Sequence, residues 1–120
     1  MHKLNLDQLH FDTVAIHAGQ GADPTFGALA TPIYQTSTFC FDTVEEGSEK
    51  FAKTRPGFVY SRAGNPTCRA LEEKIARLEG GEDCLVTGSG MGAVGSVMVS
   101  LLRQGDHVVC GDVVYGAPPW

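Results

Sequence analysis

Two short stretches of this sequence contain residue types that suit the binding of a small anion. Residues 60–67 read YSRAGNPT, so a phenol and a guanidinium stand two positions apart, just before an Asn-Pro pair. Residues 86–95 read VTGSGMGAVG and consist mostly of glycine and other small residues. Both stretches are typical of segments that hold something small and negatively charged. The question is what they hold, and whether this chain holds it alone.

The glycine loop, residues 88–93, lies between an expected strand and the start of an expected helix. The first N–H groups of a helix have no partner inside it, and the helix dipole favours an anion there. Glycines also let a ligand approach the backbone closely. Taken alone, the loop fits a phosphate site and a simple tight turn equally well.

A dinucleotide is one alternative ligand for this loop. The loop fits the loose G-x-G-x-x-A form of the dinucleotide fingerprint. Asp112 follows the next expected strand, about 20 residues on, where an acid that binds ribose would lie. An NAD-binding Rossmann protein is therefore a competing interpretation. Against it, the dinucleotide loop commonly opens its domain, whereas here a long segment comes first.

The regular elements that would position these stretches are expected after residue 65. Asn65 is a good N-cap and Pro66 suits the first helical position, so a helix should begin here and end at Gly80-Gly81. Residues 83–87 and 107–111 have the pattern of strands, and residues 91–104 have the pattern of a helix. This order predicts one βαβ-like unit.

The first half of the chain is expected to be mostly irregular. A short helix is predicted at 12–18, with Asp12 as its N-cap and Gly19 as its stop. A second is predicted at 43–52, with Asp42 and Glu45 as a capping box.

The irregular half contains too many aromatic and aliphatic residues for a solvated tail. We therefore expect it to bury against another surface, such as another subunit. This divides the chain into residues 1–64, an arm that contacts another subunit, and residues 65–120, the start of an α/β domain.

Composition excludes several classes of protein. The net charge of −5 and the absence of a basic run argue against a nucleic-acid partner. The cysteines and histidines form no zinc pattern, so no metal site is expected and the thiols should be free. No run of 18 apolar residues and no signal peptide is visible, so we expect a cytoplasmic protein without a membrane partner. The cysteines are Cys40, Cys68, Cys84 and Cys110, and the histidines are His2, His10, His17 and His107.

Seven blocks, taken in order, resemble the N-terminal part of the pyridoxal-phosphate enzymes of cysteine and methionine metabolism. Methionine γ-lyases are the most similar members; cystathionine γ-lyase, γ-synthase and β-lyase and O-acetylhomoserine sulfhydrylase are relatives. The blocks are HAGQ (17–20), GALATPIYQTSTFCF (27–41), YSRAGNPT (60–67), LEEKIARLEGGE (71–82), GSGMGA (88–93), LLRQGDHVV (101–109) and VYG (114–116). This ordered match favours pyridoxal phosphate over NAD.

The resemblance implies the type-I pyridoxal-phosphate transferase fold, of the α/β class, and a set of cofactor-binding residues. The backbone amides of Gly90 and Met91 would hold the cofactor phosphate, and Tyr60 and Arg62 would reach it from the neighbouring subunit. The arginine fork suits two parallel hydrogen bonds to phosphate oxygens, and the phenol adds a donor. Tyr115 corresponds to the family tyrosine that stacks on the pyridine ring and assists proton movement.

The resemblance also implies an activity and an assembly. The expected protein is a carbon–sulfur lyase with a small amino-acid substrate, in transsulfuration or methionine metabolism. It would be a homo-oligomer built from dimers, such as a homotetramer.

Two features depart from the family pattern. The family attaches its cofactor as a Schiff base to a lysine in a Ser-x-x-Lys setting, and none of Lys3, Lys50, Lys53 and Lys74 has that setting. After VYG, residues 117–120 read APPW, which stops a helix where the family continues one. The chain is therefore expected to be an N-terminal fragment of such an enzyme and inactive alone. A non-catalytic fragment is the competing class.

Overall fold

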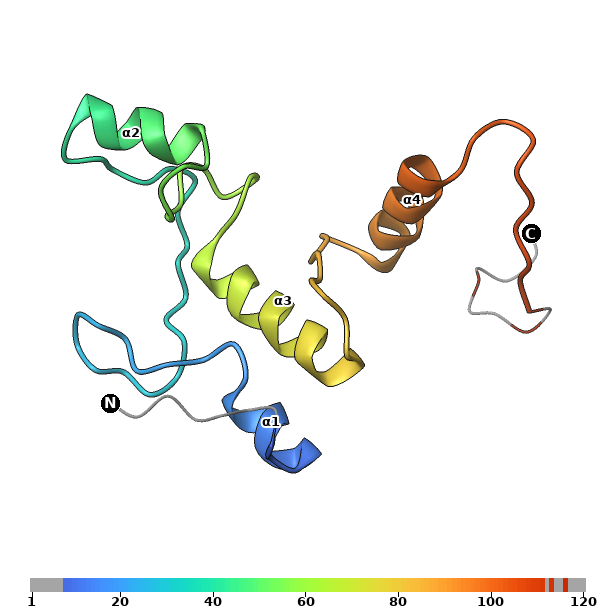
Figure 1. Ribbon diagram of the computed structural model, residues 1–120, viewed down its shortest axis with the longest axis horizontal. Helices are drawn as coiled ribbons and strands as arrows, with labels where there is room; N and C mark the ends of the chain where they lie inside the picture. Colours follow the sequence, from blue (N-terminus) through green and yellow to red (C-terminus); the bar gives the residue numbers. More distant parts are fainter. Residues whose placement is uncertain (1–7, 112, 114–115, 117–120) are drawn as a thin grey trace. The chain divides into compact units, whose positions relative to one another are not determined.

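A computed structural model of the protein describes residues 8–111, 113 and 116, and its described residues form four helices (Figure 1). The chain divides between Val86 and Thr87 into two compact units. Helices α1, α2 and α3 belong to the first unit and α4 to the second. The boundary expected at residues 64/65, between an arm and a domain, stays a prediction. The helices are α1 (Phe11–His17), α2 (Val44–Phe51), α3 (Pro66–Glu79) and α4 (Gly90–Leu101).

Helix α3 has the ends that its sequence predicts. Asn65 is the N-cap, and its side chain accepts a hydrogen bond from the Thr67 N–H at 2.9 Å. Pro66 occupies the first turn, where its missing N–H costs nothing. Gly80 ends the helix in the left-handed conformation, with φ of 64°, which glycine adopts without strain.

Helix α1 begins one residue earlier than predicted. The His10 carbonyl accepts hydrogen bonds from the N–H groups of Thr13 and Val14, so His10 is the N-cap. The expected cap at Asp12 is therefore wrong. Asp12 lies inside the first turn, where a carboxylate interacts favourably with the helix dipole. Gly19 follows the helix with φ of 67°, as expected of a stop.

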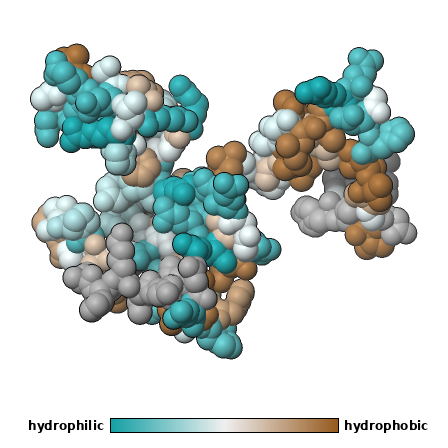
Figure 2. Space-filling model, viewed as in Figure 1, coloured by the Kyte–Doolittle hydropathy of each residue, from teal (hydrophilic) through white to brown (hydrophobic). Residues whose placement is uncertain are grey.

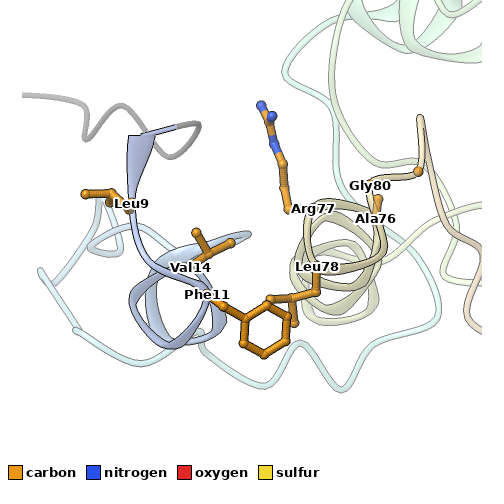
Figure 3. A pocket seen from close by; sticks show the side chains of 8 residues that line it. Leu9, Phe11, Val14, Ala76, Arg77, Leu78 and Gly80 are labelled. Atoms are coloured by element: carbon orange, nitrogen blue, oxygen red, sulfur yellow. The ribbon is translucent and has the colours of Figure 1, made fainter.

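Helices α1 and α3 lie side by side and enclose the small core of the first unit (Figure 1). Ala18 is fully buried and Ala76 nearly so. Phe11 and Leu78 project from the two helices into the space between them, which has a volume of about 460 Å³ (Figure 3). Gly19 passes so close to α3 that a Cβ there would collide with the Ala70 carbonyl oxygen. Close approach of two backbones therefore requires glycine at this position.

Helix α2 has the predicted extent within one residue, but its capping box falls one position later than predicted. Thr43 is the N-cap, and its hydroxyl accepts from the Glu46 N–H at 3.1 Å. The Glu46 carboxylate in turn accepts from the Asp42 N–H at 2.8 Å. The expected pair of Asp42 and Glu45 is wrong because Thr43 is the extended residue before the first turn, which places Glu46 at the third helical position.

The two predicted strands form no ladder among the described residues, whose only β-pairing is an isolated bridge between Thr38 and Tyr60. The predicted βαβ-like unit is thus represented in this part of the chain by its helix alone. Parallel strands exist only through neighbours that supply hydrogen bonds on either side. In place of a ladder, residues 83–86 are held by side chains. Asp83 accepts from the Cys84 N–H at 2.8 Å, and Glu72 accepts from the Val86 N–H at 3.0 Å.

Helix α4 ends at Leu101, three residues before the predicted end. A turn follows it, in which the Asp106 carboxylate accepts from the Arg103 N–H at 2.7 Å and Gly105 has φ of 98°. Apolar side chains are exposed on several sides of α4, including Val99 at 86% and Leu101 at 73%. Figure 2 shows this hydrophobic surface in brown. No helix in the described part of the chain is long and apolar enough to cross a membrane.

Candidate functional site

Tyr60 and Arg62 lie together in a tight turn. The Tyr60 carbonyl accepts from the N–H groups of Ala63 and Gly64 at 2.8 and 3.1 Å, which folds the chain back after Tyr60. The guanidinium carbon of Arg62 then lies 4.7 Å from the centre of the Tyr60 ring. Such a cation–π contact contributes about 0.5–1 kcal/mol at an exposed site. The two groups named from the sequence therefore form one pair.

The charge of the Arg62 side chain is available to a ligand. The side chain is exposed, and among the described residues it has no carboxylate partner within ion-pair distance. Arg69 differs in this respect. Its guanidinium lies 2.7 Å from Asp83 and 3.0 Å from Glu73. The hydrogen bonds to Asp83 and then Glu73 raise the pKa of Arg69, and carboxylates already neutralise its charge.

The turn that carries Tyr60 and Arg62 is fixed against residues 37–39. The Ser61 N–H donates to the Ser37 carbonyl at 2.9 Å, and the Phe39 N–H donates to the Val59 carbonyl at 3.2 Å. The rings of Phe39 and Phe58 pack at 5.7 Å between centres. Two segments of the predicted irregular arm thus hold each other in place through backbone hydrogen bonds.

The glycine loop ends at the N-terminus of α4, as the sequence predicts. Ser89 is the N-cap, and its hydroxyl accepts from the Gly92 N–H at 3.0 Å. The N–H groups of Gly90 and Met91 have no hydrogen-bond acceptor in the described part of the chain. The loop therefore presents two adjacent donors where the helix dipole favours negative charge.

The structure describes four of the five residues that the sequence singles out. Tyr60 and Arg62 form a pair in the first unit, and Gly90 and Met91 form a pair in the second. Tyr115 lies outside the described residues, as does Asp112, on which the dinucleotide interpretation relied.

Two of the lysines have structural partners. The Lys50 ammonium lies 2.8 Å from Glu46 and over the Phe41 ring, and the Lys74 ammonium donates to the Ile16 carbonyl at 3.4 Å.

Residues 12–118 match the family described as Cys/Met metabolism PLP-dependent enzyme, and the chain belongs to that family. PLP is pyridoxal phosphate, so the family match decides between the two cofactors that the glycine loop left open.

The relatives agree with this assignment. The chain is 49% identical over 97% of its length to an L-methionine γ-lyase of Treponema denticola, and 44% identical over 93% to an O-acetyl-L-homoserine sulfhydrylase of Corynebacterium glutamicum. It spans 29% and 26% of those two enzymes.

A solved structure supports the fold. A putative O-acetylhomoserine (thiol)-lyase of Campylobacter jejuni, crystallised with pyridoxyl-lysine monophosphate, matches 82% of the chain with a TM-score of 0.75 and 30% identity. The chain covers 24% of that enzyme. The type-I pyridoxal-phosphate fold class predicted from the sequence is confirmed.

Proposed function

We propose that this chain is part of a pyridoxal-phosphate-dependent carbon–sulfur lyase that acts on a sulfur amino acid and is most like methionine γ-lyase. The observation that carries the proposal is the 49% identity to the T. denticola lyase along 97% of the chain. Because the chain spans 29% of that enzyme, the activity of the whole protein belongs to the proposal.

The residues present fit the phosphate of the cofactor. Gly90 and Met91 offer two backbone donors without an acceptor in the described part of the chain, at a helix N-terminus. Arg62 offers a guanidinium without a carboxylate partner there, and Tyr60 offers a phenol beside it. Helix N-termini and arginine forks are both common phosphate-binding groups in proteins. The two amides of one subunit, together with Tyr60 and Arg62 of a neighbouring subunit, would hold the phosphate.

Each residue would have a limited role in the reaction. When bound, pyridoxal phosphate supplies an electron sink for negative charge that develops next to the substrate amino group. Arg62 and the two amides would anchor and orient the cofactor by its phosphate. Tyr115 would stack against the ring and hold or move a proton near the leaving thiol. The lysine that bears the cofactor in this family would be none of the four in this chain.

A sulfhydrylase is the second candidate function. It is favoured by the 44% identity to the C. glutamicum enzyme and by the similarity to the C. jejuni structure. Cystathionine γ-lyase and γ-synthase activities belong to the same group of alternatives. All of them would share the phosphate site and differ in the amino acid accepted.

Two chimaeras separate the lyase from the sulfhydrylase. In one, this chain replaces the matching segment of the T. denticola lyase, and in the other it replaces the matching segment of the C. glutamicum sulfhydrylase. Each is assayed on its parent's substrate, and kcat/KM is expressed as a fraction of the parent's value. We expect the fraction of the parent's kcat/KM that the lyase chimaera retains to be about tenfold larger than the fraction that the sulfhydrylase chimaera retains. The reverse order would favour the sulfhydrylase, and inactivity of two folded chimaeras would contradict both.

We further propose a cytoplasmic homo-oligomer built from dimers, such as a homotetramer, in which Tyr60 and Arg62 serve the neighbouring subunit's site. The support is the exposed position of the pair, in an arm with exposed aromatic and aliphatic side chains. The test mixes an Arg62→Ala chimaera with one that lacks the cofactor lysine. Activity that returns on subunit exchange supports the arrangement. If both variants fold, exchange and stay inactive, Arg62 acts within its own subunit.

A further inference from the structure

Asn65 is one of the few buried polar residues of the described chain, at 8% exposure, and both the oxygen and the nitrogen of its side chain are hydrogen-bonded. Its Oδ1 accepts from the Thr67 N–H at 2.9 Å, which caps α3. Its Nδ2 donates to the Tyr34 carbonyl at 2.8 Å and to the Ser61 hydroxyl at 2.9 Å. The cap uses only the oxygen, so the two bonds made by the nitrogen need a separate explanation.

One of those two bonds leads to Ser61, the residue between Tyr60 and Arg62. The Ser61 hydroxyl accepts from Asn65 and donates to the Thr36 carbonyl, while the Ser61 N–H donates to the Ser37 carbonyl. Ser61 is therefore held at three points. Because Tyr60 and Arg62 are its chain neighbours, fixing Ser61 restricts the directions of both side chains.

Thr67 ties the same segment from the other side. Its hydroxyl accepts from the Tyr34 N–H at 2.9 Å and donates to the Pro32 carbonyl at 3.0 Å. The N-terminus of α3 thus holds residues 32–34 through two side chains, and Asn65 extends this anchorage to Ser61. Helix α3 is the longest helix that the structure describes, so it offers a rigid base.

We propose that Asn65 is a positioning residue, which acts through Ser61 to hold Tyr60 and Arg62 in the geometry that binds the cofactor phosphate. The inference rests on the proposed function of that pair. Binding groups that are held in place in advance lose less freedom when the ligand arrives. Asparagine suits the position because it combines a cap acceptor with two donors, whereas a serine or threonine hydroxyl supplies the cap with one donor and aspartate supplies it with none.

Asn65→Asp separates the two roles of the side chain. Aspartate keeps the oxygen that caps α3 and loses both donors. The variant is made in the T. denticola chimaera, whose apoenzyme is titrated with pyridoxal phosphate and, separately, with pyridoxal. We expect the affinity for pyridoxal phosphate to fall about three- to tenfold, with pyridoxal affinity unchanged. A phosphate-specific loss points to the Tyr60–Arg62 pair, because pyridoxal lacks only the phosphate.

Three further variants make the result decisive. Each variant is compared by the ratio of its pyridoxal phosphate affinity to its pyridoxal affinity. Thr43→Ala removes the cap of α2, which is not hydrogen-bonded to the Tyr60–Arg62 turn. It should therefore lower the stability of the protein and leave this ratio unchanged. Ser61→Ala removes the hydroxyl that links Asn65 to the turn and keeps the cap of α3. It should lower the ratio as Asn65→Asp does. If Asn65→Asp does not fold, Ser61→Ala alone tests whether this link positions Tyr60 and Arg62. In an Arg62→Ala background, Asn65→Asp should have a smaller further effect on the ratio, because the charged phosphate contact of the pair is already lost.

The outcomes distinguish the inference from the proposed function. If Arg62→Ala lowers the ratio while Asn65→Asp and Ser61→Ala do not, Asn65 is a helix cap alone and the inference is overturned. If Arg62→Ala leaves the ratio unchanged, the phosphate role of the pair fails, and the inference fails with it. An equal loss of affinity for both ligands in Asn65→Asp would show a general structural effect and also overturn the inference.

Discussion

The segment around residues 32–67 and the unit that contains α4 differ in how they are held. In the first, side chains at the start of α3 reach across more than thirty positions of sequence to fix the backbone, as Asn65 does with Tyr34. In the second, the hydrogen bonds of the described residues are local, such as Ser89 to Gly92, and large apolar side chains remain exposed. The first segment is held by hydrogen bonds between distant parts of its sequence, whereas the apolar side chains of α4 stay exposed among the described residues.

The largest expected effect concerns catalysis by this polypeptide alone. The polypeptide of residues 1–120, assayed by itself with pyridoxal phosphate and L-methionine, should release no thiol beyond the amount that the free cofactor produces. None of its lysines has the family's Ser-x-x-Lys setting, and Lys50 and Lys74 serve structural contacts. The measurement is thiol release against a control without protein. Cofactor-dependent turnover that Tyr115→Phe abolishes would contradict it.

The contrast should also be visible in hydrogen exchange of the same polypeptide. We expect amides of residues 90–101 to exchange faster than those of residues 66–79, because each exposed leucine- or valine-sized side chain forgoes about 1.5–3 kcal/mol of burial. The exposed surface should also make the polypeptide self-associate, which sedimentation at several concentrations measures. The prediction is contradicted if the amides of the two helices exchange at equal rates and the polypeptide is a monomer with a sharp, concentration-independent thermal transition.

Gly19 tests the packing that supports α3. Gly19→Ala should lower the free energy of unfolding by about 1–3 kcal/mol, because the residue has φ of 67° and its Cβ would collide with α3. Gly21→Ala is the matched control, since a Cβ there has no neighbour within 4 Å. Denaturant unfolding of the T. denticola chimaera measures both variants. Equal stability of the two would show that α1 does not need this close approach.

The pH dependence of the Asp83 contact should be weaker than any of these effects. The Cys84 N–H and then Arg69 hold the pKa of Asp83 below its ordinary value, so the folded state binds the proton less readily than the unfolded state. The stabilisation is therefore complete above the ordinary pKa of about 3.9 and is lost as the pH falls below it. The difference in unfolding free energy between the parent and Asp83→Asn should shrink from pH 7 to pH 3. If this difference in unfolding free energy stays constant over that range, Asp83 does not contribute to the pH dependence of stability.

Local signals made parts of this structure predictable. Asn65, Pro66 and Gly80 determine their own conformations, so both ends of α3 follow from the sequence. The predicted capping box of α2 is wrong by one position, because Asp42 and Thr43 are both good caps and the choice depends on which residue is extended. The predicted strands could not form from local preference, because a ladder requires neighbouring strands.

The candidate site also has a part that could be predicted from the sequence and a part that could not. A family resemblance indicated Tyr60, Arg62, Gly90 and Met91, and the structure adds that the first two form a pair. The donors that Asn65 gives to Tyr34 and Ser61 had no signal in the sequence. The Tyr34 carbonyl lies 31 positions earlier along the chain. The Ser61 hydroxyl lies in a turn that no sequence pattern predicts.

The proposed binding of the cofactor phosphate by Arg62 can be tested by comparing two arginines of the same segment. In the T. denticola chimaera, Arg62→Ala should weaken pyridoxal phosphate binding about ten- to a hundredfold, because a charge-assisted hydrogen bond contributes about 1.5–3 kcal/mol. Arg55→Ala is the control, since Arg55 already pairs with Glu46 and Glu49. Titration of the two apoenzymes should show the loss in Arg62→Ala alone, and equal affinities would contradict the phosphate role of Arg62.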